Sequence, residues 1–240
     1  MKLFKSTLII ILIFGFSGCG SKKYVRNPID DIIKNMPGDR IFSIVLHDMD
    51  VRGSFFRDYF HQYRIIEEVT EGKPEERITE WYKVEEKVFK RHVNDMGMEL
   101  ASRGEDGKLQ KGAAPPGFNN YVGNEKYGFW DNRGGNSFWV FYGQYALLSN
   151  MLGTLTYPAR RSYYDDYRRN FSGRGRPYYG PTVGGKPYYG TRSAYNSRRT
   201  NTAWNRNRSG FKQRVSNRTS RSGSRYGGSS SRSRGGGFGK

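Results

Sequence analysis

Residues 40–50 read RIFSIVLHDMD, and the rest of the expected sheet depends on them. The centre of this stretch is apolar and β-branched on both faces, which predicts a strand inside a sheet rather than at its edge. Residues 54–66 are rich in aromatic side chains that alternate along the chain, so they predict a second, antiparallel strand. The short connection at residues 51–53 would make the two strands a hairpin.

Turn residues and periodicity predict the elements around this hairpin. Residues 29–34 predict a short helix with Pro28 at its start. Residues 79–84 follow a polar break at 71–75 and predict a third strand. A helix is expected over residues 85–100, because apolar side chains recur there at steps of three and four. These apolar positions are Val88, Phe89, Val93, Met96 and Leu100.

The following part of the chain is expected to hold a long loop and one more helix. Residues 102–136 are dense in Gly, Pro and Asn, which indicates an ordered loop. Residues 137–152 form the most apolar stretch after the N-terminus, and they predict a short helix lying on the sheet. Their Trp and Tyr side chains also suit a helix at a membrane interface, an alternative that the sequence leaves open. The expected fold of residues 38–157 is α+β, with a small antiparallel sheet and one or two packed helices.

The positive charge of the chain is concentrated behind this domain. Residues 158–240 hold 20 Lys and Arg against two acids, a net charge of +18, whereas residues 1–157 carry +1. Arg, Ser, Gly, Asn and Tyr dominate the rear part, and such a composition buries too little apolar surface to offset the entropy of ordering. Residues 158–240 are therefore predicted to be a disordered cationic tail. This part holds one weak repeat: the sequence RPYYG at residues 176–180 recurs as KPYYG at residues 186–190.

The N-terminus has the order of an export signal. Two lysines precede an apolar run at residues 8–14, and small residues then lead to Cys19. The run is shorter than the roughly 20 apolar residues that a membrane-spanning helix needs. Residues 17–20, with the sequence SGCG, resemble the lipobox of bacterial lipoproteins, although Phe16 stands where that motif usually has Leu. The alternative is an uncleaved signal anchor.

This resemblance implies that residues 1–18 are removed and that Cys19 carries acyl chains such as palmitate, which anchor the protein in a membrane. Cys19 is the only cysteine, and lipidation would consume a thiol that is otherwise a liability in an exported chain. Residues 19–37 would form a tether. Gly20 after the cysteine resembles sorting to the outer membrane rather than the inner one, so the expected location is the bacterial cell envelope, on the periplasmic or surface face of the outer membrane.

The chain also resembles, more loosely, uncharacterised cell-envelope lipoproteins with Gly/Arg/Ser-rich C-terminal tails, a resemblance that implies no activity. Arginines interleaved with Tyr, Trp and Gly favour binding to polyanions. Outside the cytoplasm these partners would be anionic lipids, lipopolysaccharide, wall polymers or extracellular nucleic acid. The candidate polyanion-binding residues are Arg174, Arg176, Lys186, Arg192, Arg198, Arg199, Arg206, Arg208, Lys212, Arg214, Arg218, Arg221, Arg225, Arg232 and Arg234.

The favoured function is therefore a non-enzymatic interaction or structural protein of the envelope, with no cofactor. The alternative is an anchored ligand-binding domain or enzyme whose tail only keeps it soluble. Catalysis has one candidate cluster, His47 with Asp48 and Asp50, which the hairpin would bring within a strand or two of His61. No spacing matches a zinc site or a nucleophile motif. His92 is expected to be a partly buried helix histidine.

Overall fold

The computed structural model describes residues 27–53, 56–70, 72–155 and 158–206. The predicted signal peptide, Cys19 and the candidate cations from Arg208 onward lie outside the described residues. None of the helices within these ranges combines the length with the apolar character that a membrane span requires.

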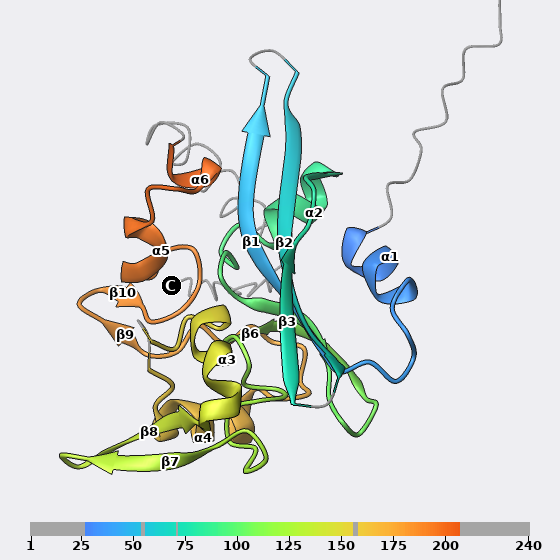
Figure 1. The fold of residues 1–240 in the computed structure, drawn as a ribbon. Coiled ribbons are helices and arrows are strands. Elements are labelled where there is room, and N and C mark those ends of the chain that lie inside the picture. The colour runs from blue at the N-terminus through green and yellow to red at the C-terminus, as the bar shows by residue number, and fades with distance from the viewer. Residues whose placement is uncertain (1–26, 54–55, 71, 156–157, 207–240) are drawn as a thin grey trace, which may run out of the picture.

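A six-stranded antiparallel sheet forms the centre of the fold (Figure 1). Its strand order is β3-β2-β1-β5-β6, and β4 also pairs with β2. The strands are β1 (Phe42–Arg52), β2 (Asp58–Thr70), β3 (Lys73–Ile78), β4 (Tyr82–Val84), β5 (Glu99–Arg103) and β6 (Leu109–Ala114). The predicted α+β class with a mainly antiparallel sheet is confirmed.

The hairpin of β1 and β2 forms as predicted, with β1 inside the sheet. Ile44 lies opposite Ile65 and Leu46 opposite Tyr63, and all four side chains are fully buried. The register shifts between Leu46 and Asp48, so that His47 is the extra residue of a β-bulge. The predicted short helix is also present, as α1 (Pro28–Lys34), with the Asn27 side chain accepting the amide hydrogen of Ile29.

The helix predicted over residues 85–100 is wrong beyond its first turns, because α2 (Glu86–Arg91) is only six residues long. The chain then turns into β5 through Gly97, whose φ of +79° suits glycine. The Gly97 amide donates to the Leu46 carbonyl (2.7 Å), and the Leu46 amide donates to the Met98 carbonyl (3.0 Å). Sheet pairing therefore replaces the helix, although four of the five apolar residues that indicate it are buried and Val88 is partly buried.

The strand predicted over residues 79–84 is present in its last three residues, but the strand that precedes it is missed. Only β4 lies within residues 79–84, while β3 begins at Lys73, inside the predicted polar break. β3 is an edge strand that keeps most of its polar side chains in solvent, so it lacks the alternating apolar pattern of a half-buried strand. Pro74 is tolerated there because an edge strand has one unpaired side.

The long loop and the helix predicted over residues 102–152 are both corrected. The predicted loop contains β6 and all of β7 (Gly128–Arg133), which pairs with β8 (Asn136–Phe141) across the left-handed pair Gly134 and Gly135. A short 3-10 turn and α3 (Ala146–Met151) complete the stretch. The alternation of β8 is obscured in the sequence by its uniformly aromatic and apolar composition.

The largest correction concerns the predicted tail, because residues 158–206 belong to the fold. We call them the C-terminal segment. Its elements are α4 (Arg161–Asn170), β9 (Thr182–Val183), β10 (Lys186–Pro187), α5 (Ala194–Arg198) and α6 (Ala203–Arg206). Figure 1 shows α5 and α6 beside the β1–β2 hairpin on the side away from α1. Aromatic side chains here supply the apolar surface that aliphatic residues usually provide: Tyr167, Tyr178 and Trp204 are at most 6% exposed.

Candidate functional site

The predicted polyanion-binding residues that the structure describes lie on the C-terminal segment. Six of them are exposed: Arg174, Arg176, Lys186, Arg192, Arg198 and Arg206. Arg199 is not, since its side chain is half-buried between β1 and Tyr195 and donates to the His47 carbonyl. Arg199 is therefore less accessible to a polymer than the other six, and a role of any of the seven in polyanion binding stays a prediction.

The histidine and aspartate residues singled out in the sequence do not form one cluster. His61 lies opposite Met49 and packs in the core against Phe89 and Tyr63. His47 instead lies beside Arg64 and Arg199, and burial with these two charges lowers its pKa to about 4. The described residues contain no group of three or more His, Cys, Asp and Glu side chains placed to hold a metal ion.

The two aspartates have separate structural partners. Asp48 accepts the backbone N–H groups of Ala203 (2.6 Å) and Trp204 (3.2 Å), which attaches the end of the C-terminal segment to β1. Burial raises the pKa of this carboxyl, while these hydrogen bonds oppose the rise. Asp50 pairs with Arg52 at the surface end of the strand. His92, as expected, is a partly buried residue at the end of α2, where it pairs with Asp95 (2.8 Å).

A polar hollow of about 300 Å³ opens between β6 and the chain that follows α4. Lys111 and Gln110 of β6 form one wall, and Arg176 and Phe171 form the other. The Arg176 guanidinium lies 5.4 Å from the centre of the Phe171 ring and donates to the Asn170 carbonyl. Lys111 is held by Asp30 of α1 (2.6 Å). The hollow thus places two cations and an aromatic ring around one opening.

Asn119 and Tyr167 line the polar hollow and belong to a hydrogen-bond network that continues into the core. Asn119 accepts from the Tyr167 hydroxyl (2.6 Å) and donates to the Glu99 carboxylate (2.7 Å). Glu99 is fully buried and also accepts from Ser43 (2.7 Å) and from the Gly117 amide (3.0 Å). Burial raises the pKa of Glu99, against the lowering effect of these donors, and it raises the pKa of Tyr167 to about 12. The Tyr167 hydroxyl therefore stays protonated at neutral pH, as its donation to Asn119 requires.

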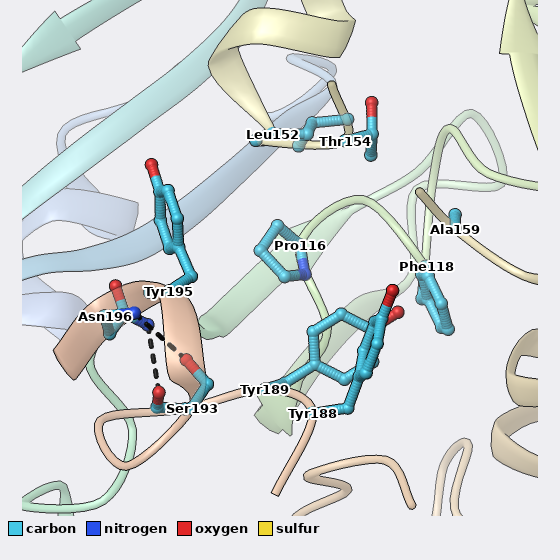
Figure 2. A pocket seen from close by; sticks show the side chains of 13 residues that line it. Pro116, Phe118, Leu152, Thr154, Ala159, Tyr188, Tyr189, Ser193, Tyr195 and Asn196 are labelled. Carbon is cyan, nitrogen blue, oxygen red and sulfur yellow. Dashed lines mark hydrogen bonds between the residues drawn. The ribbon is translucent and has the colours of Figure 1, made fainter. Parts of the chain in front are cut away.

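A second opening, the tyrosine cleft, lies where the C-terminal segment meets the body of the protein. Figure 2 shows Tyr188 and Tyr189 below it, with Pro116 and Leu152 above. Asn196 holds the wall in place by donating to the carbonyls of Met96 (2.8 Å) and Gly190 (3.0 Å). The cleft has a volume of about 50 Å³ and is mostly apolar, so it is too small for a sugar residue.

Sequence reasoning finds Arg176 but misses Lys111, Asn119 and Tyr167 in the polar hollow. Asn119 lies in a stretch that the sequence predicts to be a loop, and Tyr167 in the predicted tail. The available signal is the spacing of Tyr163, Tyr164, Tyr167 and Phe171 at steps of three and four, which is the pattern of an amphipathic helix. No protein-family model, curated protein or solved structure matches the chain.

Proposed function

We propose that this chain is a non-enzymatic interaction protein of the bacterial envelope, anchored by lipid on Cys19, whose C-terminal segment binds anionic envelope polymers or lipids. Lipopolysaccharide, wall polymers and acidic phospholipids carry the phosphate and carboxylate groups that such a surface recognises. The lipobox-like SGCG at residues 17–20 supports the anchor, and Gly20 supports the outer membrane as its location.

The observation that carries this proposal is a difference in charge pairing between the two parts of the fold. Nine of the sixteen cations that the structure describes before residue 158 have a carboxylate partner, as in Arg77–Glu67 (3.2 Å), Lys83–Asp58 (2.7 Å) and Lys126–Glu105 (2.6 Å). The exposed cations of the C-terminal segment named above have no carboxylate at ion-pair distance among the described residues. Charges without intramolecular partners remain available to an external anion, and their folded positions reduce the entropy lost on binding.

The polar hollow supports a contribution from sugar or phosphate groups of such polymers. Arg176 can bind an oxyanion, and the Gln110 amide lines the same hollow, while Lys111 is paired with Asp30. A volume of about 300 Å³ lies at the lower end of the range for small-molecule sites. This size also favours the second candidate, an anchored ligand-binding domain that takes a small anionic sugar.

Replacing the six exposed cations of the C-terminal segment by Gln is expected to weaken binding to lipopolysaccharide and to phosphatidylglycerol vesicles by at least about a hundredfold at low salt, since each cation near an anionic surface contributes about 1 kcal/mol. On a single-stranded nucleic acid, the slope of log affinity against log salt should fall by about 0.7 for each cation that contacted a phosphate. Both are measured by sedimentation and fluorescence titration of residues 19–240 with Cys19→Ser.

The matched control removes six positive charges that have carboxylate partners, in Arg77→Gln, Lys83→Gln, Lys90→Gln, Lys108→Gln, Lys126→Gln and Arg133→Gln. This control has the same net charge and should keep most of the affinity. Equal losses in the two variants would mean that only net charge matters and would contradict a specific role of the C-terminal segment. Absence of binding by the unmodified chain would end the proposal.

A further inference from the structure

Two arginines from distant parts of the chain meet at a small hollow that none of the exposed cations reaches. Arg64 comes from β2, and Arg199 follows α5 in the C-terminal segment. With His47 and Tyr195 they line a space of about 40 Å³, which we call the arginine hollow. It shares Gly97, Pro116, Leu152, Gly153 and Tyr195 with the tyrosine cleft of Figure 2, so the two openings adjoin.

The lining of the arginine hollow carries the two guanidinium charges of Arg64 and Arg199. No acidic side chain of the described residues lines it, and His47 is uncharged at neutral pH because its pKa is lowered to about 4. The nearest acid to Arg64 is Glu76 of β3, at 3.6 Å from Nε, and the Glu76 side chain is 41% exposed. Asp48 lies near Arg199, but its carboxylate oxygens already accept the amides of Met49, Ala203 and Trp204.

Both guanidinium groups also keep unused hydrogen-bond donors. A guanidinium has five N–H groups. Arg64 donates from Nη1 to the Met151 carbonyl (2.7 Å), and its buried Nε has no hydrogen-bond partner among the described residues. Arg199 donates from Nη1 to the His47 carbonyl at 3.4 Å. Backbone carbonyls therefore fix the two groups in position while leaving N–H groups for another acceptor.

We propose that the arginine hollow binds a single oxyanion group, phosphate or carboxylate, between Arg64 and Arg199. Such a group would bind to both guanidinium groups and offset the repulsion between them across the contact between β2 and the C-terminal segment. The space holds a few water molecules, so it accepts one such group and excludes a polymer. Bound there, the anion links the C-terminal segment to the sheet. This site is separate from the exposed surface of the proposed function and does not depend on it.

Inorganic phosphate is the probe, added to residues 19–240 with Cys19→Ser at constant ionic strength and neutral pH, with chloride as the balancing salt. The melting temperature should rise with phosphate and saturate, by about 5 °C at a hundredfold excess over the dissociation constant. Sodium acetate in place of phosphate distinguishes the two kinds of oxyanion. A saturable rise in melting temperature with acetate alone identifies a carboxylate site, and a rise with phosphate alone identifies a phosphate site.

Arg199→Gln should abolish this rise, whereas Arg198→Gln, which removes the same charge from an exposed neighbour, should keep it. Arg64→Lys is the second test variant: it retains one positive charge but loses the planar donor fork, so it should weaken the apparent affinity at least tenfold. The variant lacking the six exposed cations should keep the full rise. A non-saturating response, or an unchanged response in Arg199→Gln, would overturn the proposal.

Discussion

A chain that ends at residue 157 is expected to lose cooperative unfolding, whereas a chain that ends at Arg206 is expected to keep it. The shorter chain stops at the boundary that charge composition predicts, and the longer chain stops where the described fold ends. The difference between the two isolates the C-terminal segment. Its removal should expose the hydrogen-bond network around Glu99 and the apolar walls of the tyrosine cleft.

The expected size of this effect follows from the buried aromatic residues of the C-terminal segment. Tyr167, Tyr178, Tyr189 and Trp204 are each at most 8% exposed. Burying one large side chain contributes about 2 kcal/mol, so these four alone represent roughly 8 kcal/mol, comparable to the whole stability of a typical domain. The loss of Asn196 would also leave the carbonyl of Met96 without this donor.

The measurement is thermal unfolding of both truncated chains by calorimetry and near-ultraviolet circular dichroism, each starting at residue 19 with Cys19→Ser. The longer chain should melt in one transition close to that of the full-length protein. The shorter chain should show no transition or one lowered by at least about 15 °C. If residues 19–157 melt as sharply and as high as residues 19–206, the C-terminal segment adds no stability.

Acidification is expected to destabilise the protein between about pH 6.5 and pH 3, mainly through His61. Burial lowers the pKa of His61 to about 3, and His92 beside it adds to the lowering. The ring is stacked on Phe89 (5.3 Å between centroids), and Nδ1 lies 3.1 Å from the Tyr63 hydroxyl. Its Nε2 has no hydrogen-bond partner among the described residues, so the core offers no acceptor for a second proton.

The sign of the effect follows from proton uptake. In the unfolded chain His61 takes up a proton near its ordinary pKa of 6.5, whereas the folded chain resists protonation down to about pH 3. Stability is therefore complete above pH 6.5 and falls as the pH drops, by about 4 kcal/mol over the whole interval. His47 acts in the same direction down to about pH 4. Asp48 and Glu99, whose pKa values are raised, act in the opposite direction.

Because the pH ranges in which these groups titrate overlap, the test compares the pH dependence of unfolding free energy between variants rather than absolute stabilities. Urea unfolding of wild type and of His61→Phe between pH 4 and pH 7 should give a much smaller slope of unfolding free energy against pH for the variant. Tyr63→Phe removes the same side-chain hydrogen bond without removing the titrating ring, and it should retain the wild-type slope. Identical slopes in wild type and His61→Phe would show that His61 is not kept neutral by the fold.

The sequence predicts an element correctly where the pattern of apolar and polar residues matches which side chains are buried in the fold. The alternation and β-branching of β1, and the Pro28 start of α1, report directly on local structure. The prediction of a helix beyond Arg91 is wrong because the backbone around Gly97 pairs with Leu46 of β1 instead. This pairing is a tertiary interaction that the spacing of apolar residues cannot indicate. The sequence does not predict β3, because this exposed edge strand has no apolar alternation.

The candidate site is predictable only in part, because tertiary contacts bring most of its residues together. Arg176 is found because clustered cations stand out in composition, but the partners that shape the polar hollow come from β6 and α4. Tyr167 is missed because low aliphatic content is equated with disorder, although tyrosine buries comparable surface and its hydroxyl can be satisfied, here by Asn119. Arg64 and Arg199 are 135 positions apart, and only the folded contact brings them to one hollow.

If the cationic C-terminal segment is folded onto the sheet, amide hydrogen exchange of residues 19–240 with Cys19→Ser will show it. The amides of Ala203 and Trp204 should be protected, because both donate to the buried Asp48 carboxylate. Asp48→Ala should speed their exchange by roughly tenfold or more, while the amide of Leu46 in β1 stays protected. Exchange of Ala203 and Trp204 at the rate of an unfolded chain in the wild-type protein would contradict the account.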